Sequence, residues 1–118
     1  MAEVPEVPVQ DAITAAASGE YLLDVREQQE WDEVHAPGAT LLPMRALSER
    51  AGELPEDGGI LVICRSGVRS AAVAEALVAA GYPAVNVAGG MLAWEAAGGP
   101  VVRPGSPAAP PDGTAGRP

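Results

Sequence analysis

An uninterrupted apolar run, Ile60–Ile63, constrains the fold of this 118-residue chain more than any other feature. A strand with one face in water alternates apolar and polar residues, whereas a run without polar residues is typical of a strand that helices cover on both faces. Strands of that kind belong to parallel sheets in α/β proteins. The run therefore predicts an α/β fold with a buried central strand.

The segments on either side of this run alternate between strand-like and helix-like patterns. We predict further strands over residues 21–25, 39–42 and 84–87, and helices or helical turns over residues 10–18, 27–34, 44–53, 68–80 and 91–97. Within residues 68–80, an apolar helix face is predicted from Val73, Ala76, Leu77 and Ala80. Such alternation implies parallel strands joined by right-handed helical crossovers. We expect a central parallel sheet of about five strands with helices on both faces.

The length suits one domain, which we assign to residues 1–102. Residues 103–118 consist mostly of Pro, Gly, Ala and Ser and contain no bulky apolar residue. Such a composition buries too little surface to offset the entropy of ordering, so this tail is predicted to be disordered.

The charge and the single cysteine exclude several classes of function. A formal charge of −9 argues against nucleic acid and anionic membranes as partners, and no apolar stretch approaches the roughly 20 residues of a membrane span. One cysteine excludes an internal disulfide and a paired-cysteine metal or redox site. An unpaired reactive thiol and the absence of a signal-like N-terminus indicate a cytoplasmic protein, expected as a monomer or weak homodimer.

That cysteine, Cys64, follows the apolar run directly and precedes a helix-like segment. The turn continues with Arg65, Ser66, Gly67, Val68, Arg69 and Ser70. Ligands of parallel α/β sheets bind beyond the carboxyl ends of the strands, where Cys64 is expected. A helix N-terminus and two arginines lower a thiol pKa and attract anions, so Cys64 is predicted to be a nucleophile.

Four blocks of sequence, taken together, resemble the single-domain rhodanese family of sulfurtransferases over about residues 8–102. The blocks are Asp24-Val25-Arg26-Glu27 with Glu30-Trp31, His35-Ala36-Pro37-Gly38-Ala39, Cys64 to Ser70, and Val87-Ala88-Gly89-Gly90 with Trp94. Four blocks in order are far more specific than any one of them. The chain departs from the family at Val34, where Gly is common before the histidine.

The resemblance implies that sulfane sulfur moves from thiosulfate or a persulfide donor to a thiophilic acceptor through a Cys64 persulfide, without a metal or organic cofactor. The acceptor, which is cyanide, a thiol or a protein, must come from outside because the chain has no second cysteine. The turn from Arg65 to Ser70 is expected to bind the donor, through the guanidinium groups of Arg65 and Arg69 and the backbone amides between them. The family pattern implies substrate contact by Arg69 in particular.

Other residues near the turn are expected to have structural roles. Asp24 and Arg26 lie at a strand end, where a buried Asp–Arg or Glu–Arg brace is predicted, and the resemblance also implies Glu30 as the partner of Arg26. His35 is predicted to be a structural hydrogen-bonding residue, because attack by a thiolate needs no base. Trp31 and Trp94 are predicted to pack in the core.

Two alternative functions remain at this point. A dual-specificity-type phosphatase shares this fold, but its loop is one residue longer than the stretch from Cys64 to Arg69, which has four intervening residues. A regulatory module could keep the fold and carry a persulfide for one partner without turnover. Inactive relatives usually lose the cysteine, which this chain retains.

Truncation after Val102 is predicted to leave the melting temperature and the activity nearly unchanged, because the removed segment cannot build a core. Thermal unfolding and activity of the truncated and full-length proteins provide the test. A large loss of stability would show that the tail is docked on the domain.

Overall fold

A parallel β-sheet of five strands forms the centre of the molecule, in the order β1-β5-β4-β2-β3. The computed structural model describes residues 5–104. The strands are β1 (Glu6–Val7), β2 (Tyr21–Asp24), β3 (Thr40–Leu41), β4 (Ile60–Ile63) and β5 (Ala84–Val87). This arrangement confirms the predicted parallel sheet and places the apolar run in its middle strand.

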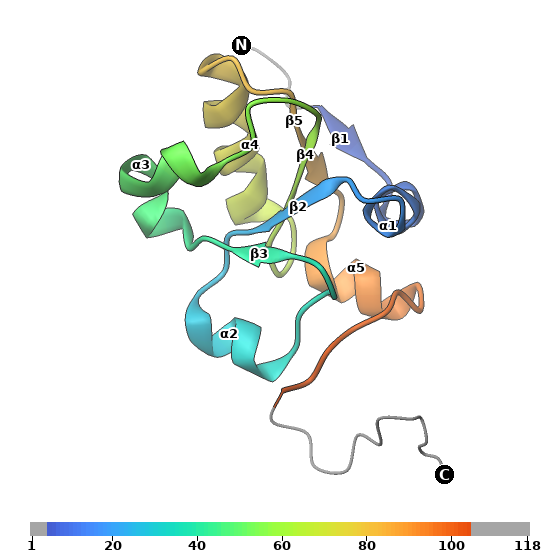
Figure 1. Cartoon of the computed structure of the whole chain (residues 1–118). Coiled ribbons are helices and arrows are strands. Elements are labelled where there is room, and N and C mark those ends of the chain that lie inside the picture. Colours follow the sequence, from blue (N-terminus) through green and yellow to red (C-terminus); the bar gives the residue numbers. More distant parts are fainter. Residues whose placement is uncertain (1–4, 105–118) are drawn as a thin grey trace, which may run out of the picture.

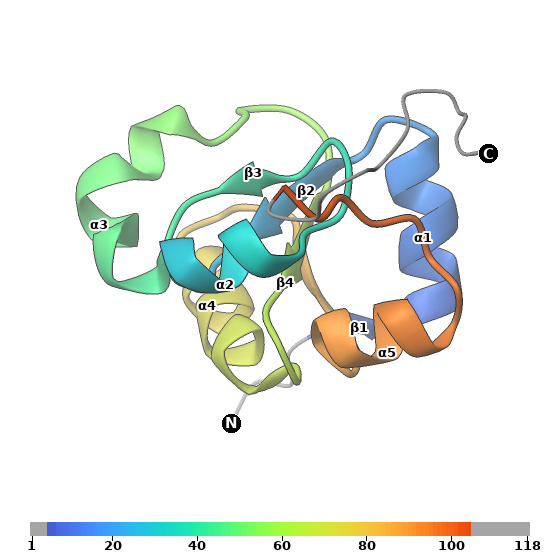
Figure 2. The same cartoon turned by 90° about the horizontal axis from the view of Figure 1, so that it is seen from below.

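Helices cover both faces of the sheet, as predicted (Figure 1). The α-helices are α1 (Val9–Ala17), α2 (Gln28–Glu33), α3 (Leu47–Arg50), α4 (Val68–Ala79) and α5 (Gly90–Ala96). In both views α3 and α4 lie on one side of the sheet and α1 and α5 on the other (Figure 2). The molecule is therefore a three-layer α/β domain.

Alternate side chains of β4 enter two separate cores. Ile60, Val62 and Cys64 pack with the α4 residues Val73 and Leu77 on one face. The intervening side chains pack on the other face with residues of α1 and α5, in a cluster that contains Leu61, Ile63, Val9, Met91 and Trp94. Because successive strand side chains point to opposite faces, the cysteine after β4 necessarily points toward α4.

The edge strand β1 was not predicted. Glu6 and Val7 pair with Asn86 and Val87 of β5, but prolines flank this two-residue strand on both sides. Proline is a signal against a strand except at a sheet edge, which is where β1 lies. Strand β1 is defined by its pairing with β5, and the residues of β1 show no strand pattern of their own.

Residues 44–53 form three short pieces and not the one helix that was predicted. A 3₁₀ turn over Met44–Ala46 precedes α3, and a second over Ala51–Glu53 follows it. The segment lies between prolines 43 and 55 and contains Gly52, and glycine and proline both disfavour a continuous α-helix. Leu54 nonetheless anchors it in the core.

The buried face of α4 differs from the predicted one. Ser70, Val73, Ala74 and Leu77 are buried, whereas Ala76 and Ala80 are exposed. The helix is rotated because Ser70, a polar residue, faces inward at its first turn.

The described chain continues slightly beyond the predicted domain boundary. Val102 exchanges two backbone hydrogen bonds with His35, and Arg103 forms an exposed ion pair with Glu95. Exposed ion pairs contribute at most about 1 kcal/mol, so the truncation prediction stands. Most of the predicted tail, residues 105–118, lies outside the described residues.

Candidate active site

Cys64 lies at the carboxyl end of β4, and the turn that follows folds back around its sulfur. The backbone N–H groups of Gly67 and Ser70 donate to Sγ at 3.1 and 3.3 Å, and the Ser70 hydroxyl lies 3.2 Å from it. Gly67 permits this curve because its φ is +101°, a conformation that side-chain-bearing residues rarely adopt. The turn is therefore shaped to surround one sulfur atom with hydrogen-bond donors.

This environment lowers the pKa of the Cys64 thiol. Burial alone raises that pKa, because Cys64 is only 1% exposed and the thiolate loses hydration. The hydroxyl and N–H of Ser70 and the N–H groups of Gly67 and Ser66 stabilise the thiolate and outweigh burial. The amino end of the twelve-residue helix α4 points at the same atom. The thiolate is the nucleophilic form, so the site prepares Cys64 for attack.

A buried polar chain holds Ser70 in place. Its hydroxyl lies 2.5 Å from Oδ1 of Asn86, and Nδ2 of Asn86 donates to the Gly67 carbonyl and to the Glu6 carboxylate. Asn86 and Ser70 are both almost fully buried. The single hydroxyl proton of Ser70 is thus shared between two acceptors, the sulfur and Asn86.

Asn86 and Glu6, which reach the cysteine turn through this chain of hydrogen bonds, were not predicted from the sequence. Asn86 was detectable as the one polar residue inside the otherwise apolar strand over residues 84–87. Glu6 carries no such signal, because its position depends on β1, which the sequence did not reveal.

Helix α5 braces the cysteine turn from the other side. The N–H groups of Met91 and Leu92 donate to the carbonyls of Cys64 and Arg65 at 2.8 and 3.0 Å. Gly90, with a φ of +58°, lies so close that a Cβ atom would be 2.6 Å from the Arg65 carbonyl carbon. Only glycine allows α5 to approach the turn this closely.

Of the three arginines near the turn, two form ion pairs among residues 5–104 and one does not. Arg26 is buried and pairs with Asp24, and it also donates to the Val34 carbonyl. Arg69 forms a two-pronged ion pair with Glu30, both contacts being 2.8 Å. Arg65 is exposed and forms no ion pair or side-chain hydrogen bond within residues 5–104.

The predicted pairing of Glu30 with Arg26 is therefore wrong. The two oxygens of Glu30 bind the Arg69 guanidinium, which lowers the pKa of Glu30 to about 2. Glu30 also accepts the N–H of Glu27 and so caps α2. The sequence did not reveal this pair because its partners are 39 residues apart and meet only in the folded sheet.

His35 and Trp31 stack on one another, with ring centroids 3.6 Å apart. Nδ1 of His35 donates to the Trp31 carbonyl, since a carbonyl can only accept. Trp94 is buried as predicted, but Trp31 is only half-buried, so its predicted place in the core is wrong. Val34 is extended, with a φ of −165°, and needs no glycine there.

Comparison with known proteins assigns the family. The model of the rhodanese-like domain matches residues 9–97. The chain belongs to the rhodanese-like family.

Individual relatives agree with this assignment. A protein named "Sulfurtransferase" from Allochromatium vinosum is 38% identical over 84 residues, covering 70% of this chain and 78% of its own length. A crystal structure of a rhodanese-related protein from Thermoplasma volcanium superimposes with a TM-score of 0.79 at 32% identity, covering 84% and 98% of the two chains. The chain matches only 19% of the length of "Probable adenylyltransferase/sulfurtransferase MoeZ" from Mycobacterium tuberculosis, with 42% identity over 76 residues and 62% of this chain covered.

Residues 5–104 contain no cluster of three or more His, Cys, Asp or Glu side chains that could hold a metal ion. Among their helices, none is long and apolar enough to cross a membrane.

Ser70→Ala is predicted to raise the pKa of Cys64, because the thiolate loses the hydroxyl donor. A lost hydrogen bond of about 1 kcal/mol corresponds to a roughly three- to tenfold slower alkylation at neutral pH. The pH profile of iodoacetamide alkylation measures this. Ser66→Ala is the matched control, because Ser66 contributes its backbone N–H and not its side chain. Equal profiles for the Ser70 variant and the wild type would show that the Ser70 hydroxyl does not lower the pKa of Cys64.

Gly90→Ala is predicted to destabilise the domain by about 2–4 kcal/mol, through strain at positive φ and overlap with the Arg65 carbonyl. Gly98→Ala is the matched control, since Gly98 also has a positive φ but has open space around it. It is expected to cost about 1 kcal/mol. Chemical denaturation measures both values, and equal losses would contradict the proposed close approach of α5 to the turn.

Proposed function

We propose that this rhodanese-like protein transfers sulfane sulfur, with Cys64 as the nucleophile that carries it. The observation that supports this most strongly is the set of donors around Sγ, which stabilises a buried anion on sulfur. A persulfide formed on Cys64 is also an anion and needs the same kind of stabilisation.

In the first half-reaction the Cys64 thiolate attacks the outer sulfur of the donor. The bond between the two donor sulfurs breaks, and its electron pair departs with the inner group, which is sulfite from thiosulfate or a thiolate from an organic persulfide. Cys64 then carries one additional sulfur. The loop amides hold the charge on that sulfur until an acceptor arrives.

In the second half-reaction an external nucleophile attacks the outer sulfur of the Cys64 persulfide. Cyanide would leave as thiocyanate, and a thiol would leave as a persulfide. The chain contains no second cysteine that could take the sulfur internally. The acceptor is therefore a small molecule or a cysteine outside these 118 residues.

The roles of the flanking residues follow from their contacts. The backbone amides from Ser66 to Ser70 are proposed to hold the sulfur, and Arg65 to meet the anionic part of the donor. Arg69, also predicted to contact substrate, would have to share its guanidinium with Glu30. Asp24, Arg26 and His35 are proposed to support the neighbouring strand ends through the contacts described above.

Cys64→Ser is predicted to lower sulfur transfer to cyanide by at least about 10³-fold while leaving the melting temperature nearly unchanged, because a serine hydroxyl is no nucleophile at this position. Thiocyanate formation with thiosulfate and with a thiol persulfide as donors gives the measurement. Activity retained in the variant would overturn the mechanism. Sulfur loading of the wild type without release to any acceptor would favour a persulfide carrier.

A further inference from the structure

Asn86 is a buried polar residue to which the proposed sulfur transfer gives no chemical role. It lies on β5 and is 1% exposed, and its side chain meets the fully buried Ser70 in the first turn of α4. Burying an amide and a hydroxyl costs free energy unless hydrogen bonds compensate for the lost water. The bonds that these two groups form with Cys64 are therefore coupled to one another.

The neighbours of Asn86 fix the orientation of its amide. Nδ2 lies 2.9 Å from the Glu6 carboxylate and 3.3 Å from the Gly67 carbonyl, and both of these groups accept hydrogen bonds. The amide nitrogen must face them, which turns Oδ1 toward Ser70. Within residues 5–104, the Ser70 hydroxyl is the only donor to Oδ1.

The Ser70 hydroxyl has one proton and two neighbours that can take it. Its Oγ lies 2.5 Å from Oδ1 of Asn86 and 3.2 Å from Sγ of Cys64. An amide oxygen can only accept, whereas a neutral thiol can donate its own proton to Oγ. With Cys64 as a thiol, the protons therefore run from Sγ to Oγ and from Oγ to Oδ1, and every group has a partner.

Ionisation of Cys64 breaks this arrangement. A thiolate has no proton to donate, so the hydroxyl of Ser70 must turn its own proton to Sγ. The new bond is charge-assisted and therefore stronger than the one it replaces. Oδ1 of Asn86 is nevertheless left buried without a donor, which is costly. Ser70 thus stabilises the thiolate, but Asn86 takes back part of that stabilisation.

A persulfide on Cys64 restores the first arrangement. Its charge or its proton lies on the outer sulfur, so Sγ becomes a neutral divalent atom and the Ser70 proton returns to Oδ1. We propose that Asn86 is a positioning residue that acts through Ser70 to keep transferred sulfur on Cys64, by favouring the persulfide over the free thiolate. The inference rests on the proposed sulfur transfer and names a residue that sets how firmly the sulfur is held.

The step that Asn86 opposes is discharge of the persulfide to an acceptor thiol. R–S⁻ plus Cys64–S–SH gives R–S–SH plus Cys64–S⁻. The new bond joins the acceptor sulfur to the outer sulfur, the bond between the outer sulfur and Sγ breaks, and its electron pair returns to Sγ. The proton stays on the transferred sulfur. Charge therefore builds up on Sγ, while Asn86 holds the hydroxyl proton that would stabilise this charge.

Asn86→Leu tests the proposal, because leucine keeps the branched outline of asparagine and removes Oδ1. The Gly67 carbonyl keeps the N–H of Ala71 as a donor in this variant. Of the two acceptors of the Ser70 hydroxyl, only Sγ remains. The pKa of Cys64, measured from the pH profile of iodoacetamide alkylation, is expected to fall by about half a unit to one unit. Asn86→Val removes the same atom with a smaller side chain and serves if Asn86→Leu fails to fold.

Retention of sulfur is the second measurement. The protein is loaded with glutathione persulfide and equilibrated with increasing glutathione, and intact mass gives the loaded fraction. Above the pKa of Cys64 the discharged form is the thiolate, so Asn86→Leu is expected to lower retention about three- to tenfold. Well below that pKa the discharged form is the thiol, and retention should match that of the wild type. A variant that only disturbs the fold would change retention at both pH values.

A double-mutant cycle separates action through Ser70 from a general disturbance. In a Ser70→Ala background, Asn86→Leu should leave the pKa of Cys64 unchanged, because no hydroxyl proton remains to be shared. None of these variants replaces the ionised groups around the turn, which are Asp24, Arg26, Glu30, Arg65 and Arg69.

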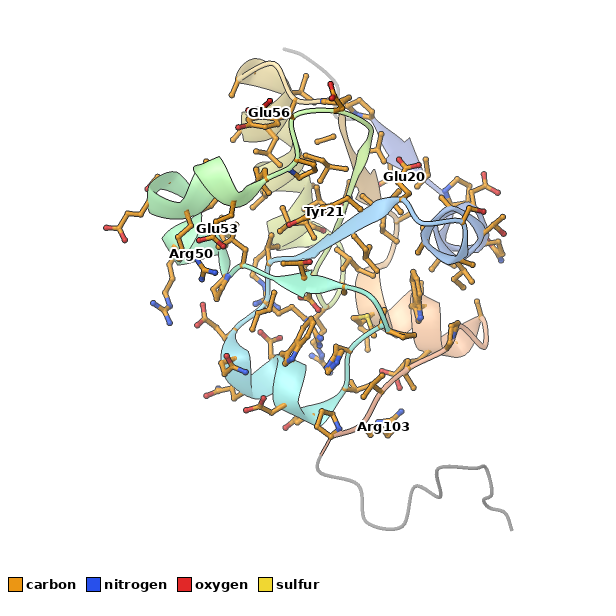
Figure 3. All side chains as sticks on the ribbon, in the orientation of Figure 1. Glu20, Tyr21, Arg50, Glu53, Glu56 and Arg103 are labelled. Carbon is orange, nitrogen blue, oxygen red and sulfur yellow. The ribbon has the colours of Figure 1, made fainter. Side chains whose placement is uncertain are left out.

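Glu6→Gln tests whether the carboxylate beside Asn86 is the cause instead. It removes the charge but keeps an oxygen that can accept from Nδ2 of Asn86, so it should shift the pKa of Cys64 much less than Asn86→Leu does. Glu53→Gln is the matched control for the loss of one negative charge, because Glu53 lies beside α3, on the opposite side of the molecule from β1 (Figure 3). It should not shift that pKa.

The outcomes separate this inference from the function on which it rests. A raised or unchanged pKa in the Asn86 variants, an equal shift in the Ser70→Ala background, or an equally large shift in Glu6→Gln would overturn the role of Asn86 and leave sulfur transfer intact. A wild type that gains no sulfur on Cys64 from the persulfide would overturn both. A lower pKa, together with weaker retention only above that pKa, would support the proposal.

Discussion

The hydrogen bonds that converge on Sγ of Cys64 are the interaction on which the rest of the site depends. A buried thiol is ordinarily a poor acid, because the thiolate loses its hydration. Here the N–H groups of Gly67 and Ser70 and the Ser70 hydroxyl replace that water, and their positions come from three different elements. Strand β4 places the cysteine, helix α4 supplies the donors, and Asn86 on β5 holds Ser70.

The charges around the turn serve a different purpose from the donors. Arg26 and Arg69 form ion pairs that join the ends of β2, α2 and α4, and the Arg69–Glu30 pair is two-pronged. Buried and half-buried pairs of this kind cost desolvation, so their benefit lies in fixed geometry more than in stability.

Much of the fold could be predicted because its signals are local. The bounds of β4 and β5 follow from short apolar runs, and the position of Cys64 follows from the end of the first run. The features that were missed or wrongly predicted depend on contacts between distant segments. Strand β1 forms because it pairs with the free edge of β5. Ser70 faces inward because it binds the sulfur and Asn86. Glu30 pairs with Arg69 because the fold brings α2 beside the turn. No residue pattern within one element records these contacts.

The most direct test of the account is the mass of the intact protein before and after brief exposure to a thiol persulfide, with peptide mapping to locate the change. The account predicts a gain of one sulfur atom on the peptide that contains Cys64, reversed by cyanide with release of thiocyanate and absent in Cys64→Ala. A protein that gains no sulfur, or gains it elsewhere, would contradict the central claim that the turn stabilises a sulfur anion for transfer.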